Sequence, residues 1–318
     1  MSRAVGSDAA KQAESVLDSS LPEVAVAVAR PAAWVGRRRT FRWRKNSVRI
    51  LLFAALMVVV LINDLPLLWM GITSIKPDRE IVVYPPTGLP IHPTLDNYVR
   101  LFTISEFGHY LFASALVATV STIGVVVLGT LGAYAVVRFK FPFVRWMGEA
   151  SLAAYMVPSI LLLVPLIQIM YAIHLDNNLI SLMLIYTTLL LPFGLWTLRS
   201  YFQGISVELE HAAMVDGCTR FGAFIRVVVP QAIPGMIAAA IFTFNAAWGE
   251  YMFASTLITN PDSLTLSPGL LLLMPSHGIQ QWGMMMAASI VMTLPLLVLF
   301  ILFQRQLVET WGEGAVKG

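Results

Sequence analysis

Six long apolar segments constrain this chain more than any other feature of its sequence. A helix needs roughly 20 mostly apolar residues to cross the hydrocarbon core of a bilayer. Segments of this kind occupy Ile50–Ile72, Leu111–Val136, Ala150–Ile173, Leu179–Leu198, Ile233–Ile258 and Trp282–Phe303. Helices satisfy their backbone polar groups internally, as lipid requires. The sequence therefore predicts an all-α integral membrane protein with six transmembrane helices.

The low charge content supports this prediction. Hydrophobic residues make up 57% of the sequence and charged residues only 12%, whereas about a quarter of the residues in an average soluble domain are charged. The net charge of +3 does not indicate nucleic-acid binding, because Lys and Arg occur in short runs beside apolar segments. The single cysteine, Cys218, excludes an intrachain disulfide and a thiolate metal cluster.

The distribution of basic residues predicts the orientation. With six spans, one side of the membrane carries 18 of the 21 Lys and Arg residues, and the positive-inside rule assigns that side to the cytoplasm. Both termini and the loop 199–232, between spans four and five, are then cytoplasmic. The N-terminal tail, residues 1–48, has no cleavable signal pattern and is expected to be mobile and basic near the membrane. A membrane domain, 49–304, and a C-terminal tail, 305–318, complete the chain.

The loop between spans four and five carries strong local helix signals. Ser206 is a suitable N-cap, and Glu208 and Glu210 lie in the opening turn, where the helix dipole favours anions. Gly217 suits the left-handed residue that ends many helices. These signals predict a short helix over Val207–Asp216.

A second loop helix is predicted over Arg220–Val229, with Thr219 as its N-cap and Pro230 at its end. On the first loop helix, Ala212 and Ala213 permit the close approach of another protein. The same pattern fits a surface helix lying along the membrane interface. The residue pattern alone leaves these two alternatives open.

The spacing of Ala212, Ala213 and Gly217, with Asp216 before the glycine, matches a loop motif that reads E-A-A, three residues, then G. In this motif the chain resembles the membrane permeases of ABC importers, in particular carbohydrate permeases similar to the second permease of the maltose system. The resemblance covers most of the chain from Leu65 onward, with further matches at Leu65–Trp69, Lys76-Pro77, Asp96–Tyr98, Met156–Ser159, Trp248–Tyr251 and Gly314–Gly318.

The resemblance implies that the first loop helix is a cytoplasmic coupling helix, which sits in a cleft of a separate ATPase and transmits its closure to the spans. The residues that inherit this role are Leu209, Glu210, His211, Ala212, Ala213, Asp216 and Gly217. The chain departs from the family pattern because His211 replaces the glutamate of the motif, Ser206 a proline and Cys218 an alanine. The glutamate of the motif is expected to form a salt bridge with a basic residue of the ATPase, and His211 cannot supply this permanent anion. The alternatives for His211 are a hydrogen bond and a pair with an acidic ATPase residue.

Motifs for catalysis are absent from the sequence. No glycine precedes any lysine, which excludes the phosphate-binding G-x-x-x-x-G-K-[ST] loop, and neither H-E-x-x-H nor G-x-S-x-G occurs. The chain is therefore predicted not to be an enzyme and to bind no cofactor or metal. ATP and Mg²⁺ are expected to be used by the partner ATPase.

Polar residues inside the predicted spans are candidates for contacts with a solute. Gln168 and Tyr171 share a face of the third span, and Asn245 and Trp248 share a face of the fifth. An aromatic ring beside amide groups suits a sugar, which offers apolar C–H faces and a rim of hydroxyls. Interfacial aromatic belts and amide ties between helices are the alternatives.

Two acidic residues lie in or near the predicted spans. Asp64 interrupts the first span, and the resemblance does not explain it. Glu250 is placed toward the outer half of the fifth span, where contact with a binding protein or a neighbouring loop is open, and packing or capping is preferred.

The predicted function is that of a permease subunit, which forms half of the pathway for a sugar in an ATP-driven importer of a bacterial or archaeal plasma membrane. The resemblance implies a second, non-identical permease, two ATPase subunits and an extracytoplasmic solute-binding protein as partners. The alternatives are glycerol phosphate or a polyol as the solute, a secondary transporter or channel, and a membrane enzyme. Specificity is shared with the partners, so the sequence does not name the sugar.

Overall fold

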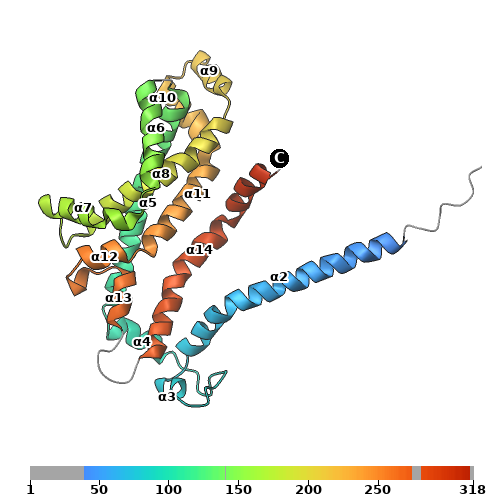
Figure 1. Ribbon diagram of the computed structural model, residues 1–318, viewed down its shortest axis with the longest axis vertical. Coiled ribbons are helices and arrows are strands. Elements are labelled where there is room, and N and C mark those ends of the chain that lie inside the picture. Colours follow the sequence, from blue (N-terminus) through green and yellow to red (C-terminus); the bar gives the residue numbers. More distant parts are fainter. Residues whose placement is uncertain (1–38, 140, 274–280, 316–318) are drawn as a thin grey trace, which may run out of the picture. The chain divides into compact units, whose positions relative to one another are not determined.

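The computed structural model describes residues 39–139, 141–273 and 281–315, and every regular element within these ranges is a helix (Figure 1). The predicted N-terminal tail up to residue 38 and the last three residues of the predicted C-terminal tail lie outside the described residues. The chain divides into two units, residues 1–62 and residues 63–318. The helix α2, Arg39–Ser74, begins in the first unit and ends in the second.

Within the part of the chain that the structure describes, five helical stretches are long and apolar enough to cross a membrane. They are α2, α5 (Phe107–Arg138), α8 (Leu179–Gly204), the continuous stretch Arg220–Trp248 and α14 (Trp282–Ala315). Each of them overlaps a predicted span. A chain with these helices is a multi-pass membrane protein.

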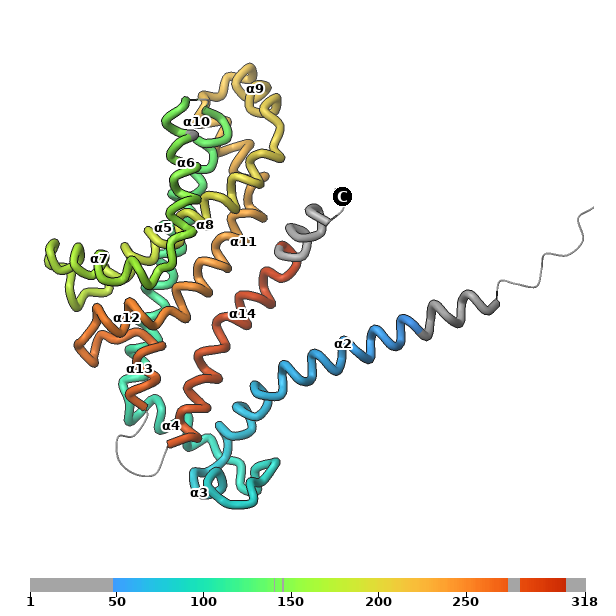
Figure 2. Tube along the Cα trace, viewed as in Figure 1, coloured from blue at the N-terminus to red at the C-terminus, as the bar shows by residue number. Residues whose placement is uncertain are grey.

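The third predicted span consists of two helices instead of one continuous helix. They are α6 (Pro142–Tyr155) and α7 (Ser159–Ala172), and the chain bends by 107° between them (Figure 2). Pro158 is the N-cap of α7 in extended conformation. Because the residue before a proline avoids the helical region, the sequence Val157-Pro158 stops α6 completely. The described residues provide up to six candidate spans if this bent pair counts as one.

The fifth predicted span also differs from its expected bounds. It begins as α10 (Arg220–Ala223), passes through one π-helical segment, η1 (Phe224–Val228), and continues as α11 (Val229–Trp248). Pro230 therefore does not end the second loop helix, which corrects that prediction. The Val229 N–H donates to the Phe224 carbonyl five residues back. Such a wide turn eases the clash between a proline ring and the preceding turn.

Short helices connect the long ones. They are α3 (Asp78–Ile81), α4 (Asp96–Thr103), α9 (Val207–Val215), α12 (Met252–Leu257), η2 (Pro261–Ser263) and α13 (Leu266–Leu272). The predicted fifth span to Ile258 thus ends at Trp248, because the chain leaves the helix at Gly249 and starts again in α12.

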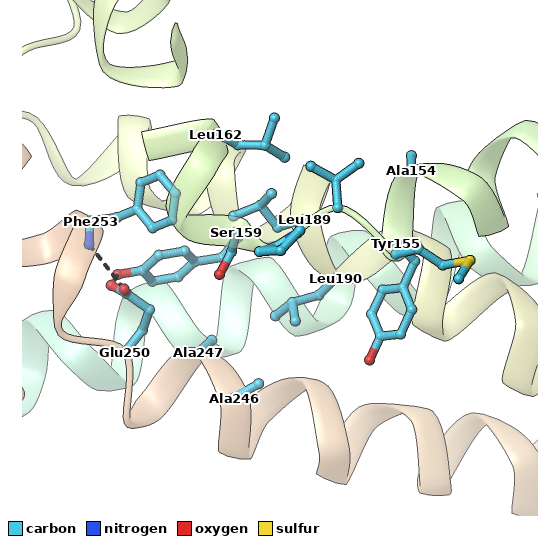
Figure 3. A pocket seen from close by; sticks show the side chains of 14 residues that line it. Ala154, Tyr155, Ser159, Leu162, Leu189, Leu190, Ala246, Ala247, Glu250 and Phe253 are labelled. Atoms are coloured by element: carbon cyan, nitrogen blue, oxygen red, sulfur yellow. Dashed lines mark hydrogen bonds between the residues drawn. The ribbon is translucent and has the colours of Figure 1, made fainter. Parts of the chain in front are cut away.

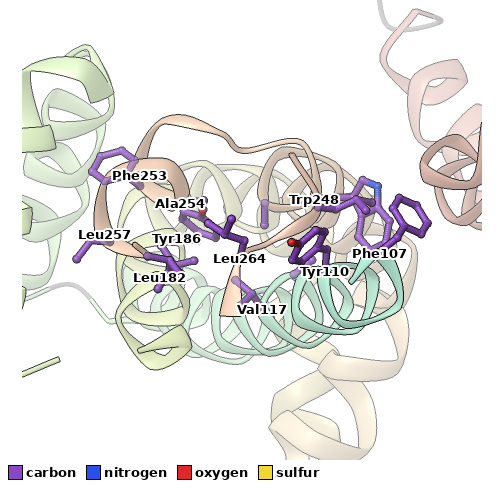
Figure 4. Packing of buried hydrophobic residues seen from close by; sticks show 14 of the residues in the cluster. Phe107, Tyr110, Val117, Leu182, Tyr186, Trp248, Phe253, Ala254, Leu257 and Leu264 are labelled. Atoms are coloured by element: carbon purple, nitrogen blue, oxygen red, sulfur yellow. The ribbon is translucent and has the colours of Figure 1, made fainter. Parts of the chain in front are cut away.

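The core of the second unit lies where α5, α8 and α11 pack together. Gly194 of α8 approaches α5 so closely that an added Cβ would lie 2.5 Å from Cγ1 of Val125. A Cβ added to Gly129 of α5 would likewise lie only 3.4 Å from the carbonyl carbon of Gly194. Small residues allow such close helix crossings in membranes. The largest buried cluster lies beside this crossing, with Tyr110, Val117, Leu182, Tyr186, Trp248, Phe253, Leu257 and Leu264 among its members (Figure 4).

A polar network joins the end of α2 to α3 and α4. The amide of Asn97, a buried residue, donates to the carbonyls of Ser74 and Lys76 at 2.8 Å each. Arg100 pairs with Asp78 at 2.8 Å. These contacts give a structural reason for the family-like residues at the end of α2 and in α4.

Candidate coupling helix and solute cavity

The helix α9 is closed at both ends by its own sequence. The Ser206 side chain accepts a hydrogen bond from the Glu208 N–H at 3.3 Å. At the other end Gly217 has a φ of +91°, and the Cys218 N–H donates to the carbonyl of Ala213 at 3.0 Å. This is the six-to-one bond of a Schellman stop, which requires a left-handed residue. The predicted cap and stop of this helix are confirmed.

Glu210 of α9 points into the protein. Its side chain is 7% exposed, and Tyr134 Oη of α5 donates to its Oε2 at 3.0 Å. The guanidinium Nε of Arg138 donates to its Oε1, and Nη2 of Arg138 donates to the carbonyl of Ile205 at 2.9 Å. The partners of Glu210 lie in a different helix more than 70 residues away in the sequence, so no local spacing indicated this contact.

Most of the other predicted coupling residues are accessible. Leu209, His211, Ala212, Asp216 and Gly217 are exposed, and Ala213 is half-buried. Large apolar side chains join this surface, since Val215 is 87% exposed and Phe221 is 68% exposed. Figure 1 shows α9 at the end of the second unit, beyond the ends of α5 and α8.

A cavity of about 350 Å³ lies where the chain breaks between α6 and α7, against α8 and the end of α11 (Figure 3). Its polar side chains are those of Tyr155, Ser159, Tyr186 and Glu250, and the rest of the lining is mainly apolar. None of the described residues that line it is Lys or Arg.

Glu250 lines this cavity and binds another residue of its lining, Tyr186. Its carboxylate accepts the Tyr186 hydroxyl at 2.5 Å and the N–H groups of Phe253 and Ala254 at 2.9 and 3.2 Å. The two backbone donors belong to the first turn of α12, so the capping role preferred for Glu250 is confirmed. The carboxylate thereby fixes the position of Tyr186 at the cavity wall.

Aromatic rings continue from the cavity along the membrane domain. The ring of Tyr155 lies 6.3 Å from that of Phe193, which lies 5.7 Å from Phe242. Tyr155 and Phe242 are 51% and 42% exposed. The sequence analysis missed these three rings because they come from α6, α8 and α11, and no local spacing relates them.

The four predicted pathway residues are placed differently from one another. Gln168 and Tyr171 are exposed on α7, and Asn245 is exposed on α11. Trp248 is 2% exposed, stacks on Phe244 and donates its indole N–H to the Met292 carbonyl at 3.1 Å. The structure thus gives Trp248 a packing role. None of the four lines the cavity, although Ala246, next to Asn245, does.

Asp64 lies exposed on α2, and no described contact explains its charge there. Among the described residues, no three His, Cys, Asp or Glu side chains form a group that could hold a metal ion.

This arrangement defines a helical membrane protein with a short anchored helix presented outside its spans and a cavity within them. The family model described as "Binding-protein-dependent transport system inner membrane component" matches residues 126–311. The chain belongs to this family and is a permease of the carbohydrate-uptake group of ABC transporters.

Two relatives agree with this assignment, and a solved structure has a similar fold. The chain is 37% identical over 261 residues to the sulfoquinovosyl glycerol transport system permease protein of Agrobacterium fabrum, covering 82% of this chain and 91% of that protein. It is 32% identical over 275 residues to the trehalose/maltose transport system permease protein of Thermococcus litoralis, covering 85% and 97%. A chain of a bacterial ABC transporter that imports the acidic polysaccharide alginate has the same fold, with a TM-score of 0.70 at 16% identity and coverage of 86% and 99%.

Proposed function

We propose that this permease forms half of the pathway of an ATP-driven sugar importer and that α9 couples it to a separate ATPase. The observation that carries the proposal is the mounting of α9. The helix is capped at both ends, and Glu210 binds it to Arg138 of α5. It exposes apolar side chains such as those of Leu209 and Val215. An exposed apolar surface held on a rigid support is typical of a protein interaction site. The coupling role inherited by Leu209, His211, Ala212, Ala213, Asp216 and Gly217 is consistent with this surface.

The proposed topology has six spans, with α6 and α7 together forming the third. The basic residues then concentrate on the side of α9, which supports a cytoplasmic position for α9 and for both termini. The bent pair suits a transporter, because broken helices in membranes are tolerated where they line a cavity.

The proposed solute is a neutral sugar. Tyr155, Ser159 and Tyr186 offer hydroxyl groups and aromatic faces at the cavity, which matches the chemistry of a pyranose. A phosphate-bearing solute would need Lys or Arg, and neither occurs among the described lining residues, which favours a sugar over glycerol phosphate. Asn245, Gln168 and Tyr171 remain proposed pathway residues on exposed faces, and Trp248 does not.

The proposed assembly contains a second, non-identical permease, two ATPase subunits and an extracytoplasmic binding protein. The family description names a binding protein, and the exposed coupling helix supports the ATPase. The chain itself acts as the transport subunit, and the partner ATPase uses ATP and Mg²⁺. A bacterial or archaeal plasma membrane is the proposed location.

The experiment that tests this function is reconstitution of the tagged chain with its neighbouring permease, ATPase and binding protein. We expect sugar uptake to require ATP, and Leu209→Asp to reduce co-purification of the ATPase by about tenfold or more, because it places a charge in an apolar interface. The control is Val99→Asp, at an exposed apolar residue of α4. A chain that purifies without ATPase and transports without ATP would instead be a secondary transporter.

A further inference from the structure

We propose that the carboxylate of Glu210 is a positioning group that fastens the coupling helix to the end of α5, so that movement of α9 is passed into the second span. The inference rests on the proposed coupling role of α9. By sequence, α9 is continuous with α8 on one side and α10 on the other. The contact with Glu210 adds a third connection, to a helix that ends about 70 residues earlier in the chain.

The geometry of this contact restrains α9 in more than one direction. Tyr134 and Arg138 lie one turn apart on the same face of α5. Each donates to a different oxygen of Glu210. Two donors from one rigid helix, each bound to its own oxygen, fix both the position and the rotation of the carboxylate.

Arg138 also connects α9 to α8. Its Nη2 donates at 2.9 Å to the carbonyl of Ile205, the residue that ends α8. The planar guanidinium has several donors in fixed directions, and here they reach two segments at once. One side chain therefore joins the end of α5, the end of α8 and the coupling helix.

The ion pair between Arg138 and Glu210 is buried among aromatic rings, which disfavours its separation. The Arg138 and Glu210 side chains are 9% and 7% exposed. The ring of Tyr134 lies 4.4 Å from that of Phe224 and 6.2 Å from those of Phe139 and Phe202. Ionic hydrogen bonds are stronger in such apolar surroundings, and separating the pair would leave a buried charge without a partner. The contact is therefore expected to stay closed while α9 moves.

Glu210 and the docking surface lie on different sides of α9. Leu209 and His211 are exposed, whereas Glu210 is buried. A change at Glu210 thus alters how α9 is attached to the spans without altering the side chains that the ATPase meets. This separation allows transmission and docking to be measured independently.

The test uses the reconstituted importer and the double variant R138M/E210L. Apolar replacement of a buried ion pair commonly preserves folding stability, so this variant is expected to fold and to co-purify with the ATPase. We expect the amount of sugar taken up per ATP hydrolysed to fall by about tenfold, a typical size for a coupling effect. The matched control is D78N, which removes the Arg100 pair at the other end of the helices and is expected to leave this ratio unchanged.

A ratio that stays within about twofold of the wild-type value in the assembled R138M/E210L complex would overturn the inference. If that variant does not fold, Y134F removes one donor only, and the ratio is expected to fall by about threefold; an unchanged ratio overturns the inference there too. If the wild-type chain does not bind the ATPase at all, the proposed coupling function itself fails, which is a separate result.

Discussion

Gly217 offers a direct test of how α9 is terminated. A Cβ added to this residue would meet no atom within 4 Å, so a clash is not the issue. The strain comes from the backbone, whose φ of +91° lies in the left-handed region. Holding a residue with a Cβ there costs about 1–2 kcal/mol. Free energy of this size shifts the population of an opened C-terminal turn by about 5- to 30-fold.

We therefore expect Gly217→Ala and, more strongly, Gly217→Val to loosen the end of α9. The amides of positions 217 and 218, which donate to the carbonyls of Met214 and Ala213, should exchange with solvent about 5- to 30-fold faster in hydrogen-exchange mass spectrometry. In the reconstituted importer, the amount of sugar taken up per ATP hydrolysed should fall, while insertion into the membrane stays intact.

The matched control is Gly204→Ala. Gly204 also has open space at its Cβ position, but it ends the regular helix α8 and has no left-handed φ. This substitution should leave exchange in α9 and the uptake ratio as they are. Wild-type exchange rates in the Gly217→Val variant would refute the strain reasoning, and normal transport by it would refute the role of this turn in coupling.

Three further outcomes are expected. Gly194→Ala should lower the unfolding free energy by about 1–3 kcal/mol through the clash with Val125, and adding Val125→Ala should recover part of the loss in thermal unfolding; no loss would contradict the close helix crossing. Tyr155→Ala should raise the KM for the sugar roughly tenfold without reducing ATPase binding, and an unchanged KM would remove this ring from the pathway. His211→Glu should weaken uptake with the native ATPase and improve it with an ATPase from a relative that has the usual glutamate, whereas equal uptake with both would exclude a matched interface.

Features set by local sequence could be predicted. Ser206 and Gly217 act on residues within one helical turn of themselves, so their roles follow from spacing alone. The long apolar helices could be predicted because length and composition suffice to identify them. The motif that indicated the family is likewise local.

Features set by distant contacts could not be predicted. The inward orientation of Glu210 depends on Tyr134 and Arg138, which no periodicity connects to it. Trp248 looked like a sugar contact, but its indole N–H is taken by the Met292 carbonyl. The complete stop of α6 could not be predicted, because a proline in an apolar segment either kinks a helix or ends it.

The close crossing of α5 and α8 has a consequence for how the protein changes conformation. Gly129 and Gly194 leave no gap between these helices, and a packed interface without free volume does not slide in small steps. The two helices are then expected to rotate as one rigid body. Bending is left to joints where the helical hydrogen bonds are already interrupted, namely the 107° turn before Ser159 and the break after Trp248. Both joints border the cavity, so an angular change at the proposed coupling end is expected to move the cavity walls first.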